Sequence, residues 1–187
     1  MRKLPQVITR EEFKQIIGSL SKSKMGRRQK AILWLLFNCG LRRQELCSLQ
    51  MKDVDLNTGR VHLRNGTKNS KDRILFFNNE TRCALIAWME VRSRIETDAP
   101  EIFITNTGKS IYHSYINKMI ERIGKKAGIE RKLYPHLFRH SALTEIYELS
   151  GNNILLTQQV AGHASVTTTQ VYAHVSASAI RETMKEF

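Results

Sequence analysis

Cysteine, acidic residues and long apolar runs are scarce in this chain. Its three cysteines are odd in number and lack the paired spacing of metal sites. We therefore expect reduced core thiols at Cys39, Cys47 and Cys83, as in a cytosolic protein, rather than disulfides. The longest apolar run, residues 31–39, includes Asn38 and is far shorter than the roughly 20 residues that a membrane-spanning helix needs. Because no charged-then-apolar signal opens the chain, the sequence predicts a soluble cytoplasmic protein without a membrane partner.

The shortage of acidic residues leaves a strong positive charge. The chain has 17 aspartates and glutamates against 30 lysines and arginines, a formal net charge of +13 and a pI of about 10.0. This balance favours a polyanion such as nucleic acid over a neutral small molecule, the alternative being a well-solvated basic surface. We prefer nucleic acid because the basic residues recur in separate segments that could follow a phosphate backbone around a groove. They are Arg27, Arg28, Lys30, Arg42, Arg43, Lys68, Lys71, Arg73, Lys125, Lys126, Arg131 and Lys132.

Helical patterns dominate the chain. Thr9, followed three residues later by Glu12, is a capping box that predicts a helix to about Leu20. Over residues 27–39 the apolar residues are too continuous for a surface helix, so we expect a central buried helix that ends at Gly40. Further helices are expected over residues 44–49, 79–94, 113–127, 136–149, 153–160 and 167–172, and an apolar face at Ala177, Ile180, Met184 and Phe187 predicts a tail helix within residues 175–187.

Strands are few and short. Alternation in residues 60–64 and the apolar run 74–77 predict two strands, joined by a loop that carries Lys68 and Lys71. Residues 102–104 are the expected third strand. The sequence thus predicts an α+β fold, predominantly α-helical with a small antiparallel three-stranded sheet, as one domain over residues 1–187.

Histidine, arginine and tyrosine gather in two C-terminal clusters. His136 and Arg139 are three residues apart, so on a helix they share a face and could grip one anion. A tyrosine such as Tyr172 is a weak nucleophile at neutral pH and needs nearby cations to act on phosphate. A single His-x-x-Arg pair is usually an ordinary surface or capping feature. His136 and His140 have the spacing of a metal pair, but no acidic or cysteine ligand follows at a known spacing, so no metal site is expected.

Four segments together resemble the catalytic boxes of the tyrosine recombinase (phage integrase) family, in order and spacing. They are Gly40-Leu-Arg-Arg-Gln-Glu-Leu46, Lys68-Asn-Ser-Lys-Asp-Arg73, His136-Leu-Phe-Arg-His140 and Ala161-Gly-His-Ala-Ser-Val-Thr-Thr-Thr-Gln-Val-Tyr-Ala-His174. The resemblance covers nearly the whole chain and implies the family's catalytic-domain fold. One such motif has a high false-positive risk, whereas four in the right order make chance a poor explanation.

The resemblance implies a role for each matched residue. Tyr172 would attack the scissile phosphate of double-stranded DNA and become linked to the 3′ end, releasing a 5′ hydroxyl without any cofactor or metal. Arg42 and Arg139 match the arginines that hold the non-bridging oxygens and stabilise the transition state. His163 would donate to a phosphate oxygen, and His136 would do the same or assist proton removal from Tyr172.

Two further positions are matched. Lys68 would protonate the departing 5′ oxygen; Lys71 is a competitor in the same loop, but the spacing to Arg73 favours Lys68. Glu45 occupies an acidic position and is expected to orient a neighbouring cationic group or helix. Arg43 lies one position off the motif, so we expect a DNA-backbone or surface arginine.

Family members mostly carry a helical domain before the catalytic one, and this chain shows no N-terminal core-binding domain. It is therefore expected to be either an excised fragment or a naturally minimal recombinase, with weak binding and poor site selectivity. By the family's habit the tail, residues 175–187, docks on a neighbouring subunit; the alternative is that it packs on its own domain. We expect a homotetramer in the synapse, a monomer when free, accessory DNA-bending proteins as partners and association with the nucleoid.

Two other functions are open to the same sequence. A type IB topoisomerase would use a similar set of side chains to relax DNA without pairing sites, and a silent DNA-binding regulator would have lost one of them. The Ala161-Gly-His box and the tail favour a recombinase that integrates or excises a mobile element or resolves DNA. The matched residues Arg42, Lys68, His136, Arg139, His163 and Tyr172 are all present, which argues against a silent regulator.

Overall fold

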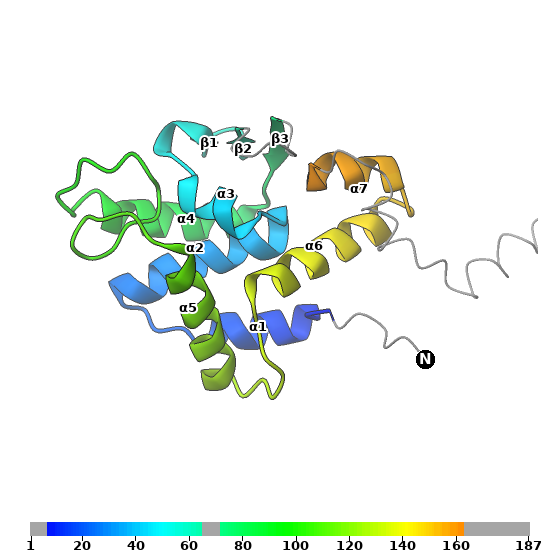
Figure 1. The fold of residues 1–187 in the computed structure, drawn as a ribbon, viewed down its shortest axis with the longest axis horizontal. Helices are drawn as coiled ribbons and strands as arrows, with labels where there is room; N and C mark the ends of the chain where they lie inside the picture. Colours follow the sequence, from blue (N-terminus) through cyan, green and yellow to red (C-terminus); the bar gives the residue numbers. More distant parts are fainter. Residues whose placement is uncertain (1–6, 65–71, 163–187) are drawn as a thin grey trace, which may run out of the picture.

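The computed structural model describes residues 7–64 and 72–162, which form a mostly helical fold with one small sheet at its edge (Figure 1). The helices are α1 (Arg10–Gly18), α2 (Lys24–Cys39), α3 (Arg43–Ser48), a 3-10 turn η1 (Met51–Asp53), α4 (Asn79–Arg92), α5 (His113–Lys126), α6 (Pro135–Leu149) and α7 (Ile154–Ala161). The strands are β1 (Val54–Asp55), β2 (Arg60–Leu63) and β3 (Arg73–Phe76). The predicted fold class, mostly helical with a three-stranded antiparallel sheet, is confirmed.

Helix α2 lies at the centre of the core (Figure 1). Its Leu33, Leu35 and Leu36 are fully buried, as expected for a helix that is apolar on more than one face. Helices α4 and α6 pack against it, and α1 adds Phe13, whose ring stacks on Phe37 with centroids 4.0 Å apart. The predicted central buried helix is therefore confirmed.

Local signals place the helix ends correctly. The Thr9 hydroxyl accepts from the Glu12 amide at 3.1 Å, and the Glu12 carboxylate accepts from the Thr9 amide at 2.9 Å. Helix α2 ends at Gly40, whose φ of 62° is left-handed and therefore favours glycine. This turn directs the chain out of the core and into α3.

The predicted third strand is wrong. The sheet has the order β1-β2-β3, so its third member is Val54–Asp55, which pairs with β2 across a short turn. Residues 102–104 are instead fully buried between helices, and Trp88 donates its indole N–H to the carbonyl of Ile102 at 2.9 Å. Ile104 forms an isolated bridge with Ser110. A short apolar run is compatible with a strand or with a buried connecting segment, and burial alone accounts for the apolar character of residues 102–104.

Several predicted features lie outside the described residues, namely the Lys68 and Lys71 loop, the helix over residues 167–172 and the tail helix in 175–187. The expected core thiols are confirmed at Cys39 and Cys47. For Cys39, burial raises the pKa of the thiol to about 12. At Cys83 the expectation is wrong, because this residue is on the exposed side of α4.

None of the described helices combines the length and the apolar character that crossing a membrane requires.

Candidate phosphate-binding site

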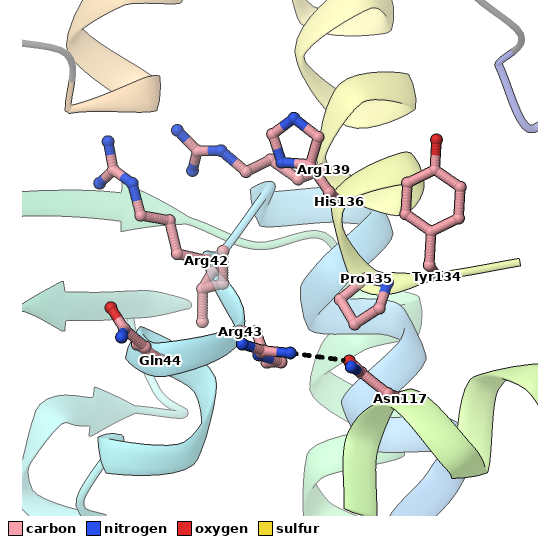
Figure 2. A pocket seen from close by; sticks show the side chains of 9 residues that line it. Arg42, Arg43, Gln44, Asn117, Tyr134, Pro135, His136 and Arg139 are labelled. Atoms are coloured by element: carbon pink, nitrogen blue, oxygen red, sulfur yellow. Dashed lines mark hydrogen bonds between the residues drawn. The ribbon is translucent and has the colours of Figure 1, made fainter. Parts of the chain in front are cut away.

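Arg42, His136 and Arg139 line one pocket, although they come from distant parts of the chain (Figure 2). Arg42 immediately precedes α3 and follows the turn at Gly40. His136 and Arg139 lie one turn apart in the first part of α6, which begins at Pro135 in the position where a missing N–H is tolerated. The expected sharing of a helical face by His136 and Arg139 is confirmed by this arrangement.

Arg139 is held firmly by backbone carbonyl groups. Its side chain is buried, with 3% of the residue exposed. Nη1 donates to the carbonyl of Gly40 at 2.6 Å, and Nη2 donates to the carbonyl of Ala161 at 2.8 Å. The guanidinium thus joins the C-terminal ends of α2 and α7, where carbonyl groups favour a cation.

Glu45 connects two arginines. Its Oε1 accepts from Nη1 of Arg42 and from Nη1 of Arg73, each at 2.9 Å, and its Oε2 accepts from Nη2 of Arg73 at 3.0 Å. Oε2 also accepts the backbone N–H of Arg42 at 2.7 Å. Burial by itself would raise the pKa of this carboxyl, but Arg73 and then Arg42 outweigh burial, so the pKa is lowered. The carboxylate is ionised at neutral pH and orients Arg42.

Arg73 is the residue that motif reasoning missed as part of the site. The motifs give Arg73 no role of its own, yet its side chain is 6% exposed and makes the paired contact with Glu45. Its Nε also donates to the carbonyl of Val160 at 2.8 Å. The available signal was the position of Arg73 at the end of the Lys68–Arg73 segment, directly before an apolar run.

Three arginines converge on the last carbonyls of α7. Arg73 binds the carbonyl of Val160, Arg139 binds that of Ala161, and Arg42 donates Nη2 to that of Gly162 at 3.2 Å. A Cβ on Gly162 would lie 2.7 Å from Nη1 of Arg73, and its φ of +60° is left-handed, so only glycine fits. The chain therefore leaves α7 beside these three cations, immediately before His163.

His136 lies in the pocket with its ring exposed to solvent. The pocket walls desolvate the imidazole and the charge of Arg139 repels a proton, so the pKa of His136 is lowered below 6.5. The ring is therefore mainly neutral at pH 7. A neutral imidazole accepts a hydrogen bond at one nitrogen and donates at the other, which suits either proposed role.

The pocket extends past these three residues. It has a volume of about 370 Å³ and also includes Arg43, Asn117 and Tyr134. Nη1 of Arg43 donates to Oδ1 of Asn117 at 3.1 Å, which links α3 to α5 (Figure 2). The predicted site residues Lys68, His163 and Tyr172 lie outside the described residues.

Residues 6–179 match the model of the phage integrase family. Tyrosine recombinase XerC of Thermodesulfovibrio yellowstonii is 31% identical over 93% of this chain and 59% of its own length. Tyrosine recombinase XerC of Lactobacillus leichmannii is 33% identical over 94% of this chain and 60% of its own length.

Solved structures agree with the sequence comparison. The crystal structure of XerA recombinase superimposes with a TM-score of 0.84 and 36% identity, covering 100% of this chain and 66% of that chain. XerH site-specific recombinase, bound to palindromic difH substrate in a post-cleavage complex, superimposes with a TM-score of 0.80 and 26% identity. This match covers 97% of this chain and 53% of the XerH chain. The chain spans less than two thirds of the length of these relatives. From the family match over most of its residues, the shared fold and the ordered motifs, this chain belongs to the phage integrase family of tyrosine recombinases.

Proposed function

We propose that this chain carries the catalytic site of a site-specific DNA recombinase that breaks and rejoins DNA through a 3′-phosphotyrosyl intermediate. The observation that carries the proposal is the convergence of Arg42, His136 and Arg139 on one pocket, beside the end of α7 that leads to His163 and Tyr172. Integration, excision and resolution all use the same strand transfers, so the proposal covers each of them.

In the proposed reaction Arg42 and Arg139 bind the two non-bridging oxygens of the scissile phosphate. The Tyr172 oxygen forms a bond to phosphorus while the bond from phosphorus to the 5′ oxygen breaks. The tyrosine proton passes to a neutral His136, and Lys68 protonates the 5′ oxygen. Attack by a 5′ hydroxyl on the phosphotyrosine reverses these steps and rejoins the strand.

Preorganisation is the physical basis of the proposed rate enhancement. Negative charge on the phosphate increases in the transition state, and cations already fixed in position stabilise it without reorganising. Arg139 is fixed by two backbone carbonyls and Arg42 by Glu45. Long, mobile arginines would lose this advantage, because ordering them would cost side-chain entropy during the reaction.

Double-stranded DNA is the proposed substrate. The net charge of +13 favours a polyanion, and XerH site-specific recombinase was solved bound to palindromic difH substrate. Relaxation of DNA by a type IB topoisomerase mechanism and silent regulation remain the competing functions. They differ from the proposal in a measurable product, because only recombination joins strands from two different sites.

A trapped covalent complex tests the proposed chemistry. The chain is incubated with a library of nicked duplexes randomised around the nick, so that the short cleaved fragment diffuses away and cannot be rejoined. We expect a protein-DNA adduct that survives denaturation, and peptide mapping should find the DNA on Tyr172. The recovered duplexes define a substrate for a strand-exchange assay between two labelled sites.

Three results would count against the proposal. Selective DNA binding without an adduct would favour the regulator, and an adduct on another residue would refute the assignment of Tyr172. Relaxation of supercoiled DNA without exchange between sites would favour the topoisomerase mechanism.

We further propose that the tail, residues 175–187, docks on a neighbouring subunit within a DNA-bound homotetramer. Its expected apolar face needs an apolar acceptor. A groove on α1, α2, α6 and the start of α4 has Trp34, Ile146 and Leu149 as its accessible apolar side chains, and 73% of Leu149 is exposed. The same groove is also lined by the charged residues Arg10, Lys14, Glu80 and Glu145. This groove is the proposed acceptor, since burying such a surface favours association.

Sedimentation measures the proposed assembly. We expect a monomer without DNA and a tetramer with two duplex sites, with Leu149→Glu shifting the DNA complex to smaller species. Leu155→Glu is the matched control, because Leu155 is 67% exposed on α7 and does not border the groove. Equal effects of the two variants would refute this acceptor surface.

A further inference from the structure

The pocket is larger than one phosphate needs. Its volume of about 370 Å³ lies in the range of roughly 300–1,000 Å³ that is usual for drug-sized ligands. The polar lining has two ends (Figure 2). The scissile phosphate is assigned to the end formed by Arg42, His136 and Arg139, whereas the other end is formed by Arg43 and Asn117.

Helix geometry separates the two consecutive arginines. Arg42 is the N-cap of α3 and has an extended backbone, whereas Arg43 is the first helical residue, so the two side chains leave the chain in different directions. Arg42 consequently turns toward Glu45, whereas Arg43 turns toward Asn117 on α5. The 3.1 Å hydrogen bond to Asn117 uses one of the five N–H donors of the Arg43 guanidinium and holds the group at the pocket wall.

The pocket is cationic along its whole length. Among the described residues that line it, three are arginines and none is an aspartate or glutamate. The charge of Arg42 is partly balanced by Glu45, whereas Arg43 donates to the neutral side-chain amide of Asn117. The Arg43 end therefore also suits an anion.

We propose that Arg43, supported by Asn117, binds a second phosphate of the same DNA strand, next to the scissile phosphate. The inference rests on the proposed function, which places the scissile phosphate at Arg42 and Arg139. Phosphates follow each other at every nucleotide of a strand, so a strand whose scissile phosphate lies at Arg42 and Arg139 also presents its adjacent phosphates to nearby groups of the same pocket. Two contacts on one strand fix its register, which a single phosphate contact cannot do.

Short nucleotides test this subsite without requiring the reaction. The probes are a 5′-phosphorylated dinucleotide, which has two phosphates, and the corresponding mononucleotide, which has one. Calorimetry on the full chain should show the dinucleotide binding about tenfold more tightly than the mononucleotide, the effect of one charge-assisted hydrogen bond. In Arg43→Gln this advantage should disappear, while mononucleotide binding changes less than about twofold.

Two variants control for folding and for general charge. Arg27→Gln removes an exposed arginine that pairs with Glu90 away from the pocket, and it should keep the tenfold advantage. Asn117→Ala keeps the charge of Arg43 but releases its guanidinium, so the advantage should fall by a factor of about three. The inference is overturned if the wild-type chain binds both probes equally, if Arg43→Gln keeps the advantage, or if Arg27→Gln loses it as well.

Adduct formation on the nicked duplex separates this inference from the proposed function. If the adduct forms but the dinucleotide has no advantage, the second phosphate site is wrong and the chemistry stands. If the dinucleotide advantage depends on Arg43 but no adduct forms, the phosphate site stands and the proposed chemistry is wrong.

Discussion

Glu45→Gln is expected to lower the free energy of unfolding by about 3–5 kcal/mol, because it leaves the buried charge of Arg73 without its counter-ion. The side chains of Arg73 and Glu45 are 6% and 13% exposed, and two hydrogen bonds join them. A loss of this size is a large part of the stability of an ordinary domain. Urea denaturation at pH 7 measures it.

The matched control for this substitution is Glu90→Gln. Glu90 pairs with Arg27 at 3.4 Å, but the two side chains are 61% and 45% exposed. Solvent screening limits such a pair to less than about 1 kcal/mol. If both substitutions cost the same, the buried pair has no special role. Glu45→Met combined with Arg73→Met should restore much of the loss, since replacing a buried ion pair by apolar groups is often neutral.

The same pair makes stability depend on pH. Because the pKa of Glu45 is lowered on folding, the unfolded chain takes up its proton first as the solution is acidified. The contribution is therefore complete above the ordinary value of 4.5 and is lost as pH falls through the folded value. The difference in stability between wild type and Glu45→Gln should be constant from about pH 6 to 8 and should shrink below about pH 4.5.

Arg139→Lys is expected to slow adduct formation by about 10²–10³-fold, the loss typical of removing one preorganised donor. Lysine keeps the charge but lacks the planar fork, so it cannot span the carbonyls of Gly40 and Ala161 and also present an N–H to the phosphate. Duplex binding should fall by less than about tenfold, because many other cations contribute to it. Single-turnover rates on the nicked duplex measure the effect.

Two controls bracket this result. Arg10→Lys alters an exposed arginine that pairs with Glu145, and it should leave the rate within about twofold of wild type. Tyr172→Phe should give no adduct, which defines the background. A rate for Arg139→Lys within about tenfold of wild type, measured on folded protein, would contradict the proposed role of the guanidinium fork.

Much of the fold could be predicted because its signals are local. The capping box at Thr9 and the stop at Gly40 each depend on a few neighbouring residues, so the pattern alone placed these helix ends. Residues 102–104 show where such patterns fail. Their apolar run is compatible with a strand or a buried connector, and only their packing against Trp88 decides between these.

The candidate site could be predicted only in part, because only some of its residues lie in short local motifs. The motifs identified Arg42, His136 and Arg139 by residue type and spacing, and the structure places all three on one pocket. Arg73 was missed because its importance lies in a contact with Glu45, 28 residues away, and in another with Val160, 87 residues away. Periodicity in a sequence carries no information about such partners.

The amino-acid sequence alone determined the chemical inventory of this protein, which comprises its positive charge, its helical majority and the order of its family motifs. These properties depend on composition and short-range spacing, both of which are contained in the sequence itself. The tertiary structure alone decided that Glu45 joins Arg42 to Arg73, and that these two arginines and Arg139 meet the last carbonyls of α7. Those contacts exist because α6 packs against both α2 and α7, and α7 packs against β3, so packing brings together residues that are far apart in the sequence.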